Sequence, residues 1–270
     1  MSRYLTSSDH CEIVRLISAP RLGTYVALVK SQSDEDAVEL HQAIMNLGIA
    51  IMAVTSLIEV ALRNSVCQKI TEALNVDTWL RHPPEFFKWS SLEIAAIKKA
   101  TDQAKRAEYS KLSNVDKIAL DDLAFPNGLP PTIKHRKLAQ HRQSKIVVHD
   151  DQIIAQLTMH FWKRLFSEQY EKTLWKRCLK NVFPNKLISR QAISAKLEVI
   201  YGTRNRLAHH EPVYGLRLTE TLEAINFFLM NIGSRRPSRE TAFAKLIQPQ
   251  YDILLGQVAV FQHTFERLCR

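Results

Sequence analysis

The sequence is poor in glycine and has no clustered cysteines, and both features narrow the fold. Glycine accounts for 7 of the 270 residues, and the 10 prolines fall largely between apolar segments. A fold of many strands joined by tight turns would need more glycine and more proline within the turns. We therefore expect long helices and an all-α fold. Cys11, Cys67, Cys178 and Cys269 are widely separated, without the spacing of a zinc site or a disulfide framework. We expect reduced thiols, no metal site and no cofactor.

The sequence also lacks a secretory signal and an apolar run of full membrane-spanning length. The apolar run Leu47 to Ile58 is bounded by Asn46 and Glu59, which leaves about a dozen apolar residues where a span needs about 20. A run of that length is more typical of a buried core helix. We therefore expect a cytoplasmic protein with no membrane partner.

Acidic residues are outnumbered. The chain has 37 Lys and Arg against 27 Asp and Glu, a formal net charge of +10. Such a field attracts polyanions and speeds their encounter with the protein, so RNA or another nucleic acid is the leading class of partner. The same charge also keeps many basic proteins soluble without any such partner.

A length of 270 residues allows one large domain or two small ones, and we predict one compact body over residues 1–270. In the N-terminal part, 1–75, we expect two short helices that are separated by a break at Ala19-Pro20. A long helix follows from about Asp36 to Leu74. The apolar positions of the long helix recur at intervals of three and four residues, as packing on one broad face requires. They are Leu40, Ile44, Leu47, Ile51, Val54, Ile58, Ala61 and Leu62.

The remaining chain divides into a central part, 76–149, and a C-terminal part, 150–270. The central part starts with a turn whose aromatic residues, Trp79, Phe86 and Trp89, we expect to tuck against a core. A helix from about Ser91 to Lys111 follows. The C-terminal part contains a helix signal from Asp150, a helix from about Ser189 to His209, and a last pair covering about 217–233 and 238–269.

A basic connection in the central part is a candidate RNA-binding segment. No acidic residue occurs between Leu123 and His149. Cations there would contact phosphates, which positions nucleic acid without reading its sequence. The alternative, weighed equally, is a solvated loop. The candidate RNA-binding residues are Lys134, Arg136, Lys137, Arg142 and Lys145.

The densest group of chemically useful residues lies at the end of the predicted 189–209 helix. Asn205 and His209 are four apart and share a helix face, whereas Arg204 and His209 are about 140° apart around an ideal helix. Pro212 disfavours the α conformation just before it, so we expect a loosened last turn from which His209 swings toward Arg204.

Arg204, Asn205 and His209 together would suit cleavage of an RNA phosphodiester without a metal. Imidazole titrates near neutrality and serves as a general base or acid, and a helix C-terminus favours its charged form. The Arg204 guanidinium would hold the phosphate, and the Asn205 amide would orient phosphate or base. The alternative is structural, since His and Arg near a helix end also interact well with its dipole.

This segment, Arg204-Asn205-Arg206-Leu207-Ala208-His209 followed by His210-Glu211-Pro212, resembles the motif of the Abi-like (abortive infection) branch of the HEPN superfamily. Residues 58–64, Ile-Glu-Val-Ala-Leu-Arg-Asn, are similar to the family's N-terminal Glu/Arg-Asn helix, and residues 154–166 are similar to its central aromatic helix. The resemblance implies a HEPN-like antiparallel helical bundle, here with additional N-terminal and central helices.

Residues around the motif are candidates for supporting roles. Glu59 and Arg63 are four apart and would pair on one helix face if that face is exposed. If the face lines the site, Glu59 would hold Arg204 or His209, and Arg63 or Asn64 would contact phosphate. Arg206 shares a face with His210, and His210 is the alternative proton carrier to His209.

We therefore predict an enzyme, a metal-independent endoribonuclease that leaves a 2′,3′-cyclic phosphate. The resemblance adds three expectations: an anti-phage toxin role, a homodimer with a composite site, and a neutralising RNA or protein partner. The alternatives are a non-catalytic RNA-binding scaffold and a protein-interaction module.

Overall fold

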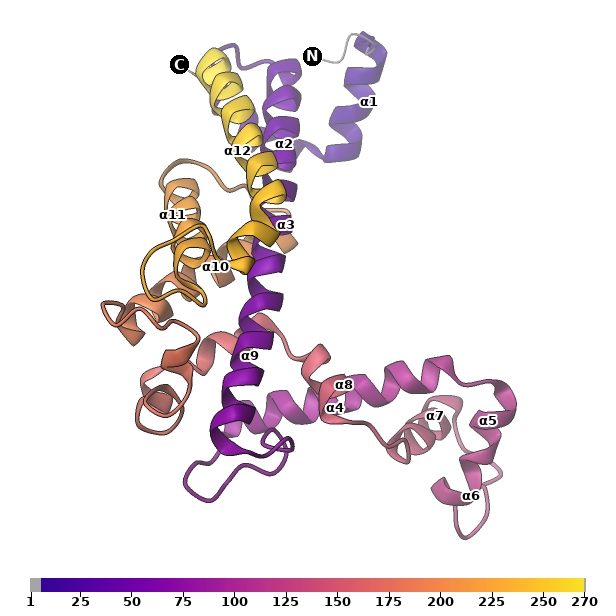
Figure 1. Cartoon of the computed structure of the whole chain (residues 1–270). Helices are drawn as coiled ribbons and strands as arrows, with labels where there is room; N and C mark the ends of the chain where they lie inside the picture. The colour runs from indigo at the N-terminus through magenta and orange to yellow at the C-terminus, as the bar shows by residue number, and fades with distance from the viewer. Residues whose placement is uncertain (1–5, 270) are drawn as a thin grey trace. The chain divides into compact units, whose positions relative to one another are not determined.

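The protein is all-helical. The computed structural model describes residues 6–269, and over that range it contains helices and no strand (Figure 1). The prediction of an all-α fold is therefore confirmed. The α-helices are α1 Ser7–Ile17, α2 Ala19–Val26, α3 Asp34–Leu74, α4 Ser91–Lys111, α5 Asn114–Ala119, α6 Asp121–Ala124, α7 His135–Ser144, α8 Asp150–Gln156, α9 Met159–Arg164, α10 Arg190–Ala208, α11 Gly215–Asn231 and α12 Ala242–Cys269. Three shorter turns are η1 Glu168–Tyr170, η2 Glu171–Trp175 and η3 Leu179–Asn181.

The helices group into two units. Unit 1 joins the N-terminal residues through Ser65 to the residues from Asn181 onward, and unit 2 is Val66–Lys180. The sequence led us to expect one compact body. The length of α3 explains the difference, because its 41 residues span about 60 Å, about twice the diameter of a small domain.

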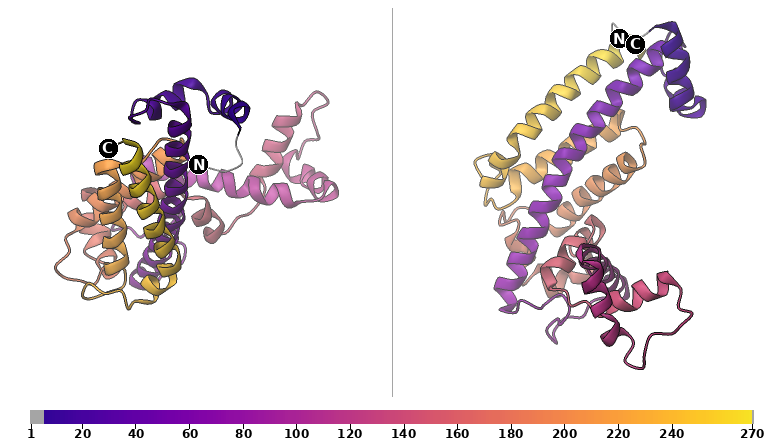
Figure 2. Two further views of the ribbon diagram at one scale, coloured as in Figure 1. Left: turned by 90° about the horizontal axis from the view of Figure 1, so that it is seen from above. Right: turned by 90° about the vertical axis from the view of Figure 1, so that its right-hand side faces the viewer.

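Unit 1 is built around the first three quarters of α3. The predicted apolar stripe of α3 is buried from Leu40 to Leu62, except for Ala61, which is half-buried. Helices α2, α10, α11 and α12 add further buried residues to this core. Figure 2 shows α12 beside α3, and the two run antiparallel: Arg267 near the end of α12 pairs with Glu39 near the start of α3 (Figure 2).

A close approach between α3 and α10 fixes where the end of α10 lies. A Cβ atom added at Gly48 of α3 would be 2.9 Å from Cδ2 of Leu207. A larger residue at position 48 would push Leu207 away. Glycine costs about 1 kcal/mol in a helix interior relative to alanine, so its presence in mid-helix needs a packing reason of this kind.

Helix α3 is long and apolar enough to cross a membrane by length and composition alone. Half of its most apolar 18-residue window is buried inside the structure. The core helix of a soluble protein meets the same criteria, and in unit 1 α3 contacts α10 near Gly48 and α12 near Glu39.

Unit 2 packs α7 and α8 against α4 and buries an aromatic cluster. Trp79 and Trp89 are buried as predicted, and the Trp89 ring meets Phe161 and Tyr170 with centroids 5.7 and 5.8 Å apart. Phe86 was expected in the same core. It is instead 39% exposed, and the Arg177 guanidinium lies 4.0 Å from its ring centroid.

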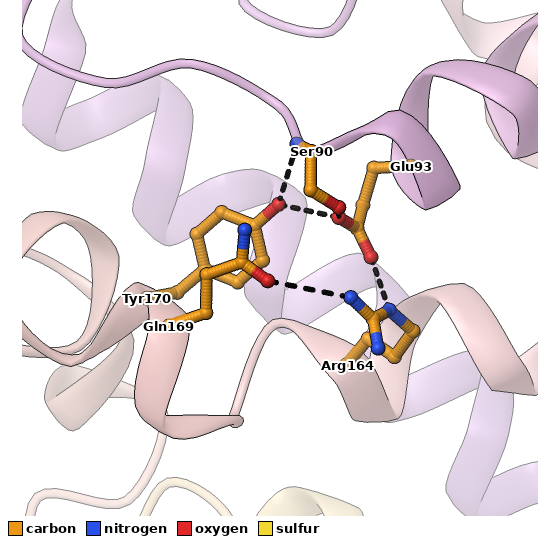
Figure 3. Close-up of polar contacts among 5 residues, drawn as sticks. All are labelled: Ser90, Glu93, Arg164, Gln169 and Tyr170. Carbon is orange, nitrogen blue, oxygen red and sulfur yellow. Dashed lines mark hydrogen bonds and ion pairs between the residues drawn. The ribbon is translucent and has the colours of Figure 1, made fainter.

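A buried carboxylate ties α4 to the segment that follows α9 (Figure 3). Glu93 is 1% exposed, and it accepts hydrogen bonds from Arg164, Ser90 and Tyr170, the last at 2.5 Å. The Tyr170 hydroxyl in turn accepts from the Ser90 backbone N–H at 3.2 Å. A buried charge needs such a set of donors, and here it has them.

Two helix boundaries in the C-terminal part differ from the predictions. The helix signal from Asp150 corresponds to α8 and α9, which are separated by the extended residues Leu157 and Thr158. Asp150, expected as a possible cap, is the first helical residue and pairs with Arg81, while His149 is the cap. The last pair, α11 and α12, starts and ends within a few residues of the prediction.

Candidate functional site

The end of α10 is closed by a well-formed cap. The backbone N–H of Glu211 donates to the Arg206 carbonyl at 2.8 Å, and that of His210 donates to the Leu207 carbonyl at 3.0 Å. These two bonds form a Schellman motif, in which the residue after the cap adopts the left-handed conformation. That residue is His210, with φ of 57°. The helix ends at Ala208, close to the predicted His209, but the last turn is fixed by hydrogen bonds rather than loosened.

Arg206 and Glu211 add a side-chain contact across the same cap. The Arg206 guanidinium lies 3.0 Å from the Glu211 carboxylate, and the two side chains are 38% and 48% exposed. An ion pair this exposed contributes about 0–1 kcal/mol. Arg206, predicted as a supporting residue of the site, thus lies at the base of the cap and neutralises Glu211.

Arg204 forms an ion pair with Glu59 of α3. The guanidinium donates to the Glu59 carboxylate, and the side chains are only 20% and 17% exposed. Of the three partners considered for Glu59, namely Arg63, Arg204 and His209, the structure pairs it with Arg204. Burial lowers the pKa of Arg204, although a guanidinium remains charged in proteins. The pair anchors α10 to α3.

Asn205 and the two histidines are exposed, in contrast to Arg204. The Asn205 carbonyl accepts from the His209 backbone N–H at 3.1 Å, so the two residues lie one turn apart. The structure thus brings Asn205, His209 and His210 to solvent at one helix end and directs the Arg204 guanidinium to Glu59.

His209 and His210 line a pocket of about 210 Å³ within unit 1. Helix α2 forms the opposite side with Arg21, Thr24 and Tyr25. Glu211 and Pro212 complete the lining, and neither Arg204 nor Asn205 is part of it among the described residues. A volume below the ~300–1,000 Å³ of typical small-molecule sites suits one phosphate with part of a sugar.

The sequence predicted the second short helix, now α2, but gave neither it nor His41 a role in the site. The Tyr25 ring meets His41 of α3 edge to face, with centroids 5.1 Å apart. Burial lowers the pKa of His41, and the charge of Arg21 lowers it further. Burial raises the pKa of Tyr25, while Arg21 acts in the opposite direction. Sequence spacing carries no signal for this arrangement, because 16 residues separate Tyr25 from His41 and 188 separate Arg21 from His209.

Arg63 and Asn64 follow Glu59 on α3 by about one turn. Arg63 is half-buried and Asn64 is exposed, and Nε of Arg63 lies 3.4 Å from Oδ1 of Asn64. Neither residue is among the seven that line the pocket, within the part of the chain that the structure describes. Their predicted contact with phosphate stays a prediction.

The basic segment of unit 2 is a helix, where we expected a connection or loop. Residues His135–Ser144 form α7 because the segment from 134 to 145 holds good helix formers and neither glycine nor proline. Arg142 is only 12% exposed and makes two hydrogen bonds to Asp121, at 2.7 and 2.6 Å, which lower the pKa of that carboxyl. Lys134, Arg136, Lys137 and Lys145 are exposed.

The four cysteines are free thiols, and burial raises the pKa of Cys178 to about 11. Within residues 6–269, no three His, Cys, Asp or Glu side chains are grouped so as to hold a metal ion.

No protein-family model, no curated protein and no solved structure matches the chain. The resemblance to Abi-like HEPN proteins thus stays a prediction. A proposal for the function therefore rests on the geometry of the α10 end and of its pocket.

Proposed function

We propose that the protein is a metal-independent endoribonuclease of the HEPN type that acts as a toxin in anti-phage defence. One observation supports the chemistry most strongly: the exposed imidazoles of His209 and His210 line a pocket together with a guanidinium, that of Arg21. Two imidazoles that can transfer protons and one permanent cation are what phosphodiester cleavage without a metal requires.

In the proposed reaction an imidazole removes the proton of the ribose 2′-hydroxyl. The 2′-oxygen then bonds to phosphorus, the P–O5′ bond breaks, and the 5′-oxygen takes a proton from an imidazolium. The products are a 2′,3′-cyclic phosphate and a 5′-hydroxyl. We assign the acid role to His209 and the base role to His210.

Arg204, which the sequence analysis placed on the phosphate, has a supporting role in this proposal. Its ion pair with Glu59 turns the guanidinium away from solvent, so in a single chain it supports the site by holding the end of α10. In a homodimer with a composite site, the second copy of the motif would contribute its own histidines. Asn205, exposed one turn before His209, remains a candidate for contacting phosphate or base.

A non-catalytic RNA-binding scaffold is the second candidate. Four exposed cations on and beside α7, Lys134, Arg136, Lys137 and Lys145, favour it. Contacts of this kind with phosphates give binding that weakens steeply with salt. In that case the protein would retain RNA without cutting it.

Incubation of RNA with the purified protein in EDTA tests the proposal. We expect cleavage by the wild type and a loss of roughly 100- to 10,000-fold in rate for His209→Ala or His210→Ala, the usual contribution of general acid–base catalysis. His263→Ala is the matched control, because His263 is exposed on α12 and is not in the pocket lining. Intact RNA with the wild type, or equal rates for all variants, would rule out the mechanism.

The role of Arg204 needs a variant that keeps the fold. Arg204→Ala alone would leave Glu59 buried without a cation, so we would combine Arg204→Met with Glu59→Leu, which removes both charges together. If Arg204 only anchors α10, the double variant keeps its activity. Loss of cleavage with far-UV circular dichroism unchanged would instead assign Arg204 to the reaction.

A further inference from the structure

Arg21 is the cation in the pocket that is available to a ligand. It is exposed on α2, and among the described residues no carboxylate forms a salt bridge with it. The one carboxylate in the lining, Glu211, pairs with Arg206 at 3.0 Å. The positive charge of Arg21 is therefore not cancelled within the pocket.

The surroundings of Arg21 favour an anion. Arg21 and Tyr25 of α2 line the pocket together, and beside the larger effect of burial the charge of Arg21 lowers the pKa of the neighbouring His41. His209 and His210 face the same space. The hydroxyl of Thr24, also in the lining, adds a neutral donor.

The size of the pocket limits the anion to a small group. At about 210 Å³ it is below the range of sites that enclose a whole drug-sized ligand. It has room for one phosphate with part of a sugar. Arginine suits such a group, because its planar fork donates two parallel hydrogen bonds to phosphate oxygens.

We infer that Arg21 binds an RNA phosphate beside His209 and His210, and so supplies the phosphate contact that Arg204 cannot supply while it is paired with Glu59. The inference rests on the proposed ribonuclease function and adds to it a residue outside the Arg204–His209 motif. Arg21 would thereby determine which phosphodiester of a bound strand faces the two imidazoles.

Binding of an oligonucleotide that cannot be cleaved tests this separately from catalysis. The probe is a fluorescent strand with 2′-O-methyl groups at every position, because it lacks the attacking hydroxyl. We expect Arg21→Ala to weaken binding about tenfold and to reduce the slope of log K against log salt by about 0.7, the value for one lost phosphate contact on a single strand. Arg21→Lys should keep the slope. The control is Arg235→Ala, which removes one exposed charge from the α11–α12 loop.

Equal affinity and equal salt slope for Arg21→Ala and Arg235→Ala would overturn the inference, as would a wild type that does not bind the strand. A nucleoside monophosphate that binds as tightly as the strand would overturn the assignment to RNA. If the wild type binds the probe through Arg21 but does not cleave ordinary RNA in EDTA, the contact stands and the nuclease proposal fails. If Arg21→Ala cleaves RNA with kcat and KM unchanged, the nuclease proposal stands and the role of Arg21 is overturned.

Discussion

At the scale of single residues, the sequence predicted where α10 ends but not how it ends. Pro212 placed the boundary correctly, because a proline disfavours the α conformation before it. The left-handed His210 was not foreseen, since that position usually holds glycine. The pairing of Glu59 with Arg204 was one of three alternatives considered from the sequence, whereas Arg21 was given no role because its pocket neighbours His209 and His210 are distant in sequence.

The conformation of His210 leads to a prediction about stability. A non-glycine residue in the left-handed region costs of order 1 kcal/mol, and a β-branched residue costs more. We expect His210→Gly to change the free energy of unfolding by less than about 1 kcal/mol, and His210→Val to lower it by about 1–3 kcal/mol. Urea titration followed by circular dichroism measures both. Equal losses in the two variants would show that side-chain contacts of His210, and not its backbone, decide the effect.

At the scale of elements, periodicity predicted the long helices and failed where local composition was ambiguous. The bounds of α4 match the predicted Ser91 to Lys111, and α3 lies within two residues of its predicted start. Helix α7 was expected as a loop because charge, rather than helix propensity, guided the interpretation. The Glu93 network was also missed, because its partners Arg164 and Tyr170 lie more than 70 residues away.

The Glu93 network predicts an acid-sensitive element in unit 2. Burial by itself would raise the pKa of Glu93, but hydrogen bonds from Arg164, Ser90 and Tyr170 hold it below its ordinary value of 4.5. A lowered pKa contributes stability above about pH 4.5, and that stability is lost as the pH falls through the folded-state pKa.

We therefore expect the free energy of unfolding of the wild type to fall more steeply below about pH 4.5 than that of Glu93→Gln, when tryptophan fluorescence is followed in urea. Glu85→Gln, at an exposed position of unit 2, is the control and should follow the wild type. Parallel pH profiles for Glu93→Gln and the wild type would contradict this role of the network.

At the scale of the whole molecule, the two units can be observed separately. All four tryptophans, Trp79, Trp89, Trp162 and Trp175, belong to unit 2, whereas circular dichroism reports the helices of both units. Composition and periodicity could predict the all-α class. They could not predict the division into units, which depends on long-range contacts along the two ends of α3.

Glu59→Gln in unit 1 tests that division. It leaves the largely buried Arg204 with a neutral partner, which costs about 1–3 kcal/mol. We expect the circular-dichroism transition in urea to broaden or move to lower denaturant, while the fluorescence midpoint changes less. Identical shifts by both probes would mean that the protein unfolds as one cooperative body.

Mass analysis of RNA fragments produced in EDTA tests the proposed chemistry most directly. Attack by the 2′-hydroxyl, with His209 and His210 moving the protons, predicts fragments that end in a 2′,3′-cyclic phosphate and begin with a 5′-hydroxyl, and predicts none from His209→Ala. Fragments that carry 5′-phosphates, or the same cyclic ends at an undiminished rate from His209→Ala, would contradict a nuclease site at the end of α10.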